Sequence, residues 1–340
     1  MTKKFWSVVL VLSMVLSLAA VAGAAMTPEE EEEAWKKEPA YGKTIRIGYN
    51  GGLCTGTLGL TVVQRFYEAE GIKAEVIRYQ GDTVDLGNAL GTGRIDVAGG
   101  HIATLLVPAV NGVQMKFTNG MHTGCKSLCV LADSPYKTTK DLAGKTVAIP
   151  SGIGGSDHNI TMRFLLRDGM DPVNGVKYKA TDQGAAVLAM QSGEIAAGLF
   201  SDQFIQKFLA DGTLRILRSI TFDDDFKEET CCIFAVSKSL CEDSPITTKK
   251  ITRAHEATRE WIMANREEAV DVLLENKWGS GKFEDVLAYY NTLSYSVTDQ
   301  VTGDTLRKVI DDYKICGILN KDLNTDEALA RVWNPVLLQD

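Results

Sequence analysis

Two stretches of this 340-residue sequence echo each other: DTVDLGNALGTGRIDVAGG at residues 82–100 and DQGAAVLAMQSGEIAAGLF at residues 182–200. Aligned without gaps, Asp82 falls on Asp182 and Ile95 falls on Ile195. Each stretch reads as a helix, a glycine turn and a strand of small residues. Glycine turns recur throughout α/β folds, so chance similarity is the alternative. The matched order of several elements favours two related α/β lobes.

The segments before the two stretches extend the echo. IGYNGG at residues 47–52 and AIPSGIGG at residues 148–155 both lead from a strand, through glycines, into a helix. Strands that alternate with helices through short turns predict parallel pairing. We therefore expect a two-lobe clamshell of type II, with parallel-dominated sheets flanked by helices.

The lobe boundaries follow from the segments that join the two units. We expect residues 44–122 and 237–340 to form the first lobe and residues 123–236 to form the second. The chain would cross between the lobes near residues 120–126 and 229–232, and these two crossings would form the hinge. CCIFAVS, residues 231–237, reads as the strand leading back. Helices are expected after it at residues 247–265, 266–276, 283–293 and 298–313.

The N-terminus reads as a cleavable export signal of residues 1–24. Lys3 and Lys4 precede an apolar run, and the run ends in the small-x-small sequence Ala22-Gly23-Ala24. The apolar run is almost long enough for an uncleaved membrane anchor, but the cleavage pattern favours removal. No cysteine lies beside the cleavage sequence, which favours a free periplasmic protein. Residues 25–43 would follow as an acidic, solvated helical lead-in.

Composition narrows the class of partner. The chain is 45% hydrophobic and 24% charged, which is ordinary for a soluble globular protein. Its formal net charge of −8 makes it a poor ligand for nucleic acid. We expect a monomer that binds a small-molecule solute and carries no cofactor.

Three sequences carry a resemblance to a known family: LGTGRIDVAGG (90–100), KTTKDLAGKTVAIPSGIGGSDHNITMRFLLRDGM (137–170) and AAVLAMQSGEIAAGLF (185–200). They resemble the periplasmic binding proteins of the sulfonate, nitrate, taurine and thiamine-precursor group. The resemblance implies a clamshell that closes on a small solute and delivers it to the membrane permease and ATPase of an ABC importer. It does not identify the solute.

Ligands of open α/β sheets bind beyond the carboxyl ends of the strands, where glycine turns expose backbone N–H groups and helix N-termini favour anions. Any one such turn is explained as well by a tight bend alone. Four turns at equivalent strand ends favour a binding site. The expected ligand-binding residues are Cys54, Thr55, Gly99, Gly100, His101, His122, Gly155, Ser156, Asp157, Ser201, Asp202 and Cys231. Lys126 and Arg163 are the basic residues expected nearby.

Cysteine and histidine side chains gather near the same strand ends and crossings. One interpretation is structural, with a disulfide between Cys125 and Cys129 or between the two crossings. The other is a soft site for a transition metal or metal complex. Its candidate ligands are Cys54, His101, His122, Cys125, Cys129, His158, Cys231 and Cys232.

A catalytic alternative rests on CCIFAVSKSL, residues 231–240. This stretch resembles the cysteine-rich segment of the thiamine-pyrimidine synthases, with Cys231, Cys232 and Phe234 matching. Ile233 and Ala235 interrupt the family's longer cysteine run, and those enzymes act inside cells. The match therefore supports the fold more than the activity, and we expect no catalytic residues.

Overall fold

The computed structural model describes residues 26–80 and 83–338 of the chain. The expected export signal at residues 1–24 lies outside the described residues. Across the described ranges, every helix is too short or too polar to span a bilayer.

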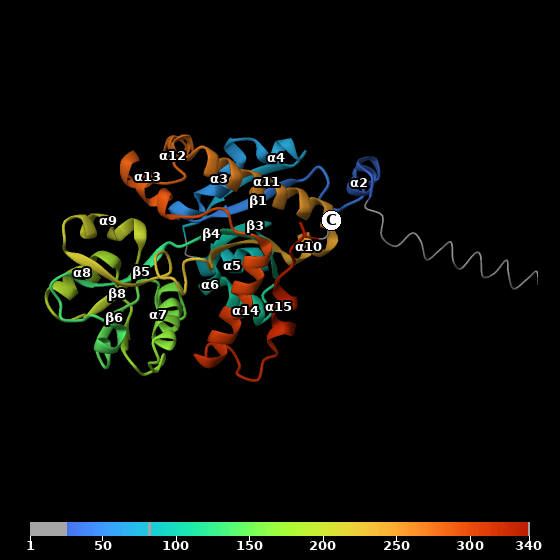
Figure 1. The fold of residues 1–340 in the computed structure, drawn as a ribbon. Coiled ribbons are helices and arrows are strands. Elements are labelled where there is room, and N and C mark those ends of the chain that lie inside the picture. Colours follow the sequence, from blue (N-terminus) through green and yellow to red (C-terminus); the bar gives the residue numbers. More distant parts are fainter. Residues whose placement is uncertain (1–25, 81–82, 339–340) are drawn as a thin grey trace, which may run out of the picture.

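Two five-stranded sheets form the centres of two lobes (Figure 1). The first sheet has the order β2-β1-β3-β10-β4 and the second has the order β7-β6-β8-β5-β9. The strands of the first sheet are β1 (Thr44–Tyr49), β2 (Lys73–Arg78), β3 (Val97–His101), β4 (Met115–Thr123) and β10 (Thr230–Ser237). Those of the second are β5 (Lys126–Leu131), β6 (Thr146–Ala148), β7 (Lys177–Lys179), β8 (Ala197–Ser201) and β9 (Leu214–Ser219).

Both sheets are mixed, so the expected dominance of parallel pairing needs a correction. β1 pairs in parallel with β2 and β3, whereas β10 runs antiparallel between β3 and β4. In the second lobe β6 pairs in parallel with β7 and β8, and β5 runs antiparallel between β8 and β9. The antiparallel member of each sheet is the strand that arrives from the other lobe. It enters the sheet from the crossing and so runs against β3 or β8.

The position of β10 also moves the second boundary. The sequence placed residues 231–236 in the second lobe, but β10 is an inner strand of the first sheet. The two sheets are therefore joined by a short crossing between β4 and β5, at residues 124–125, and by a longer one between β9 and β10, at residues 220–229.

Helices cover both sheets. The first lobe carries η1 (Leu53–Gly56), α3 (Thr57–Val63), α4 (Phe66–Ala69), α5 (Thr83–Gly91), α6 (Ile102–Val110), α10 (Lys238–Asp243), α11 (Pro245–Ala264), α12 (Arg266–Glu275), α13 (Phe283–Thr292), α14 (Asp299–Ile315) and α15 (Thr325–Val332). The second lobe carries η2 (Thr139–Leu142), α7 (Ser156–Arg167), α8 (Gln183–Gln191) and α9 (Asp202–Ala210). The four helices expected after residue 247 are present, each within two residues of its expected bounds.

The echo between the lobes is exact in register. Ile47 pairs with Val97 in the first sheet, and Val147 pairs with Ala197 in the second. The same offset of 100 residues relates α5 to α8, β3 to β8 and α6 to α9. The structure therefore confirms the repeated units and adds α6 and α9, which the sequence did not predict.

The acidic lead-in is docked onto the first lobe and is not solvated throughout. α2 (Pro28–Trp35) begins at a capping box made by Thr27 and Glu30. Trp35 is buried, and its Nε1 donates to Thr247 Oγ1 at 2.9 Å. The Glu38 carboxylate accepts the backbone N–H groups of Ile246 and Thr247, which lie at the start of α11.

The two lobes also touch directly, with α6 packing against α7 and α9 against α13. Asn159 on α7 donates to the backbone carbonyl of Ala103 at 2.8 Å. Gln203 on α9 donates to the carbonyl of Ser280 at 3.3 Å. These bonds hold the lobes close together on both sides of the crossings.

Candidate functional site

Six of the eight cysteines and histidines proposed as soft ligands come together at the lobe junction. Donor atoms of His101, Cys125, Cys231 and Cys232 lie within 4.8 Å of one another. Those of Cys54, His122 and Cys232 form a second group within the same limit, so Cys232 belongs to both. We call these six residues the sulfur cluster.

The strand register brings these residues together. Cys232 on β10 lies opposite His101 on β3 and opposite His122 on β4, so three strands place one residue each in a row. Neighbouring residues of a regular strand point to opposite faces. The pairing of β10 with β4 shifts on both sides of Cys232, and such an irregularity lets Cys231 and Cys232 join one cluster.

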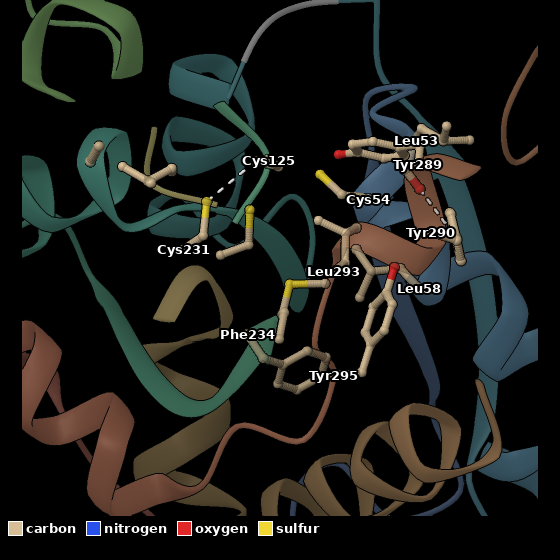
Figure 2. Close-up of a cluster of buried hydrophobic side chains, with 14 of the residues drawn as sticks. Leu53, Cys54, Leu58, Cys125, Cys231, Phe234, Tyr289, Tyr290, Leu293 and Tyr295 are labelled. Atoms are coloured by element: carbon tan, nitrogen blue, oxygen red, sulfur yellow. Dashed lines mark hydrogen bonds between the residues drawn. The ribbon is translucent and has the colours of Figure 1, made fainter. Parts of the chain in front are cut away.

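The contacts inside the sulfur cluster are close. Cys125 Sγ lies 3.3 Å from Cys231 Sγ and 3.8 Å from His101 Nε2. Cys231 Sγ lies 3.3 Å from His101 Nδ1. Figure 2 shows the Cys231 side chain directed at Cys125, with Cys54 across from them. All seven cysteines of the chain are buried free thiols.

Charge in the sulfur cluster is shared between thiols and imidazole. Burial opposes the charged form of His101, but the Cys125 and Cys231 sulfurs outweigh it and hold the pKa of His101 well above its ordinary value. Burial likewise opposes ionisation of Cys231, yet hydrogen bonds from Cys125 and Cys232 and the charge of His101 set its pKa well below the ordinary value. Burial raises the pKa of Cys232, and hydrogen bonds with the sulfurs of Cys125 and Cys231 raise it further. The directions of these pKa shifts favour the thiolate form of Cys231 next to the protonated form of His101.

His122 is poised differently from His101. The side chain is fully buried, and its Nδ1 lies 3.0 Å from the backbone carbonyl of Thr123, to which only a protonated nitrogen can donate. In the neutral ring the lone pair is then on Nε2, which has no hydrogen-bond partner among the described residues. Burial opposes the charged form of the ring, but the Cys54 sulfur outweighs it and raises the pKa of His122. Since the donor atoms of His122, Cys54 and Cys232 are grouped, an unsatisfied acceptor faces sulfur in the protein interior.

Cys129 and His158 lie outside the sulfur cluster. Cys129 is in β5 and packs in the second lobe's core, with its Sγ 3.8 Å from the Ser127 carbonyl oxygen. His158 is in α7, where its ring packs edge-on against Tyr178. Neither grouping of potential ligands includes them. The structure does not support the local Cys125–Cys129 disulfide considered from sequence. The sulfur of Cys125 faces that of Cys231, and Cys129 packs in the second lobe's core.

The acidic residues expected to bind ligand have partners within the protein. Asp157 forms an ion pair with Lys126 and accepts the backbone N–H of Ser151 at 2.6 Å. The Asp202 carboxylate accepts the hydroxyls of Ser127, at 2.6 Å, and Thr221. Burial raises the pKa of Asp202 to about 6. These carboxylates organise the strand ends of the second lobe.

Ser201 and Thr55 are also occupied locally. Ser201 caps α9 by accepting the backbone N–H of Phe204, and Thr55 donates to the Gly52 carbonyl at 2.9 Å. Gly155 precedes the first turn of α7 and has no side chain, but Ser151 Oγ accepts the backbone N–H of Asp157 at 2.8 Å and so caps this helix start.

Gly99 and Gly100 have a packing role. We expected them to let a ligand approach the backbone, but both are buried. A Cβ at Gly99 would lie 2.6 Å from Met121 Sδ, and one at Gly100 would lie 2.5 Å from Thr83 Cγ2. Neighbouring side chains therefore already fill the space that the glycines leave.

Comparison with known proteins identifies the family and the fold of this chain. A model of the NMT1-like family matches residues 38–274. The chain belongs to the NMT1-like family. A relative from Brucella abortus (strain 2308), named as a binding protein, is 22% identical over 236 residues, covering 67% of this chain and 70% of the relative.

Solved structures agree on the fold of this NMT1-like chain. The periplasmic aliphatic sulphonate-binding protein SsuA from Escherichia coli is similar with a TM-score of 0.68 at 18% identity, covering 86% of this chain and 92% of SsuA. The periplasmic nitrate-binding protein NrtA from Synechocystis PCC 6803 is similar with a TM-score of 0.68 at 15% identity, covering 87% of each chain. The family member thus has the α/β periplasmic-binding-protein fold.

Sequence reasoning missed the ion pairs that join the lobes of this NMT1-like protein. It treated Arg163 as a possible anion ligand. Arg163 instead contacts Glu229 and Asp312, each at 2.8 Å, and links α7 to α14. A cavity of about 30 Å³ lies between Arg163, Glu229, His101 and Cys231, with room for one water-sized molecule. Local sequence carries no signal for pairs so far apart in the chain.

Proposed function

We propose that this chain is the extracytoplasmic solute-binding component of an ABC importer, exported to the periplasm by its N-terminal signal. It captures a small molecule between its lobes and delivers it to a membrane permease and ATPase, without catalysing a reaction. One observation carries this proposal. Two lobes with the same strand-end geometry, 100 residues apart in the chain, meet at two crossings and are bridged by polar contacts.

The second lobe supports a polar solute. α7 begins at Ser156. Ser151 Oγ takes the Asp157 N–H, and the other N–H groups of this first turn suit an anionic or strongly polar group. Lys126 and Arg163 are paired with carboxylates, so neither adds a free positive charge. SsuA and NrtA are named for sulphonate and nitrate. Sulfonates, nitrate and pyrimidines therefore form the first panel.

The test is a thermal-shift screen of the mature chain under reducing, metal-free conditions. A true solute should raise Tm with its concentration, because a ligand at 100 times its Kd stabilises the folded state by about 2.7 kcal/mol. If the solute is anionic, Ser156→Asp should abolish the shift by adding a second carboxylate to the first turn of α7, where Lys126 already pairs with Asp157. Ser239→Asp is the matched control. Ser239 is exposed in the first turn of α10, which follows β10 and therefore lies beyond the amino end of β3, away from the lobe junction.

Two results would contradict the proposal. One is a panel in which no compound shifts Tm in a concentration-dependent way. The other is chemical turnover of a stabilising compound, which would instead favour the enzyme considered from the sequence. Cell fractionation of the tagged full chain tests export separately, with the shortened protein expected in the periplasm.

A further inference from the structure

The sulfur cluster has the composition of a metal site. Three cysteines and one histidine, His101, Cys125, Cys231 and Cys232, bring their donor atoms within 4.8 Å of one another. Tetrahedral zinc with Zn–S bonds of about 2.3 Å separates its sulfur ligands by about 3.8 Å. The observed Cys125–Cys231 separation of 3.3 Å and Cys125–His101 separation of 3.8 Å are within small side-chain adjustments of that geometry.

An unpartnered histidine supplies an independent observation. In the neutral ring, the buried Nε2 of His122 carries the lone pair and has no hydrogen-bond partner among the described residues. Its other nitrogen is fixed by the Thr123 carbonyl, which is how metal-binding histidines are usually oriented. Nε2 is grouped with the sulfurs of Cys54 and Cys232. A buried acceptor left without a partner costs folding free energy, so the cluster keeps an unused metal-donor atom beside the sulfur of Cys232.

Backbone conformation points to the same place. Cys125 has a φ of +97°, a conformation that non-glycine residues rarely adopt. This residue is the one that presents its sulfur from the short crossing between β4 and β5. Strained positions of this kind persist where the surroundings require them and concentrate at binding sites. The strain is explained if the Cys125 sulfur has to be held within the cluster.

We propose that the sulfur cluster binds one thiophilic d10 metal ion, with Zn²⁺ as the representative, through His101, Cys125, Cys231 and Cys232. Thiolate and imidazole ligands select such ions over Mg²⁺ or Ca²⁺, which prefer oxygen. Cys54 and His122 stand on the other side of Cys232 as adjacent donors. Binding displaces to solvent the thiol protons of the cysteines and the extra proton of a protonated His101, because cysteine binds metal as thiolate and histidine as neutral imidazole.

The position of the ion has a consequence for the lobes. Cys125 belongs to the short crossing, and Cys231 lies at the start of β10, where the longer crossing ends. An ion held by both would tie the two crossings together at the junction. The site does not depend on the import proposal. A failure to bind metal would leave solute capture untouched, and a failed solute screen would leave this site untouched.

The test uses the mature chain, purified anaerobically with a non-thiol reductant and stripped of metal. Zn²⁺ is titrated against a competing chelator, and Co²⁺ is added separately to reveal thiolate-to-metal charge-transfer and tetrahedral d–d bands. We expect one Zn²⁺ per chain and the Co²⁺ bands. Cys232→Ser should weaken Zn²⁺ binding by about 100-fold or more and should remove most of the charge-transfer intensity.

Cys241→Ser and Cys316→Ser are the matched controls, because each replaces a buried cysteine outside the cluster. Both should bind Zn²⁺ as the parent does. If Cys232→Ser does not fold, as judged by circular dichroism, His101→Asn and Cys231→Ser provide the same readout. Parent binding no tighter than that of the cluster variants would overturn the proposal. So would a Cys125–Cys231 disulfide, without bound metal, in protein isolated directly from the periplasm.

Discussion

The ends of β3 and β8 occupy the same place in the two lobes yet carry opposite chemistry. His101 ends β3 and turns its ring to the sulfurs of Cys125 and Cys231, leaving α6 without a side-chain cap. Ser201 ends β8 and caps α9. The next residue is Ile102 in the first lobe and the buried acid Asp202 in the second. One repeated backbone thus presents soft donors on one side and oxygen donors on the other.

This difference teaches that the lobes have divided their roles. The first lobe holds the sulfur cluster, and the second uses hydroxyls and carboxylates to fix its strand ends and the crossings. Substitutions at matched positions should therefore have unequal effects.

The Arg163 ion pairs, which link α7 of the second lobe to α14 of the first, should give the largest effect on stability. Arg163→Met removes the buried guanidinium that Glu229 and Asp312 share. The two carboxylates keep only the more exposed Lys308 and Arg167, so the change should cost about 3 kcal/mol of unfolding free energy. Arg167→Met is the control, because Arg167 is more exposed and Asp312 keeps Arg163. Urea unfolding of both variants measures the difference. Equal losses would show that Arg163 is not the buried link between the lobes.

Asp202 should make the unfolding free energy depend on pH, whereas the equivalent residue of the first lobe, Ile102, does not titrate. Its folded pKa of about 6 exceeds the ordinary aspartate value of about 3.9, so the folded state binds the proton more tightly. Stability from this group is therefore present below pH 4 and is lost as pH rises through 6, by about 2–3 kcal/mol.

Asp202→Asn should reduce that loss between pH 4.5 and 7, as measured by urea unfolding of the metal-free protein. Asp182→Asn, which alters an exposed cap on the same lobe, should leave the parent slope in place. An unchanged slope in Asp202→Asn would contradict the burial argument.

Some elements and site residues could be predicted from the sequence, and others depend on contacts between distant parts of the chain. Local glycines and helix periodicity predicted the repeated units and the helices from α11 to α14. The place of β10 depends on pairing across more than 100 residues, which local pattern does not encode. Cys54, His101, His122, Cys125, Cys231 and Cys232 were grouped correctly because they lie near strand ends and crossings. Cys129 and His158 lie near them in sequence, but their side chains pack within the second lobe.

Glycine and alanine exchange places between the equivalent strand pairs of the two lobes, β1–β3 and β6–β8. Gly48 pairs with Ala98, whereas Ala148 pairs with Gly198. A Cβ on Gly198 would overlap the Phe200 ring. Gly198→Ala should therefore lower unfolding free energy by about 1–3 kcal/mol through overpacking. Gly184→Ala is the control, because the added Cβ meets nothing closer than 3.4 Å. Similar stabilities for both variants would indicate that the second lobe repacks freely.

The smallest expected effect concerns the caps. Ser201→Ala removes the hydroxyl that accepts the Phe204 N–H and should cost about 1 kcal/mol. Ser201→Thr keeps a hydroxyl cap and should retain most of that stability. Thermal unfolding of the two variants provides the comparison, and an equal loss in both would rule out capping as the role of Ser201.

The central claim is that two related lobes close on a small solute. Small-angle X-ray scattering of the mature chain, with and without a solute identified by the thermal screen, tests it most directly. The account predicts that the bound form scatters as this structure does, with its Asn159–Ala103 and Arg163–Asp312 contacts formed, and that the free form has a larger radius of gyration. Identical scattering from the free and bound forms would contradict it.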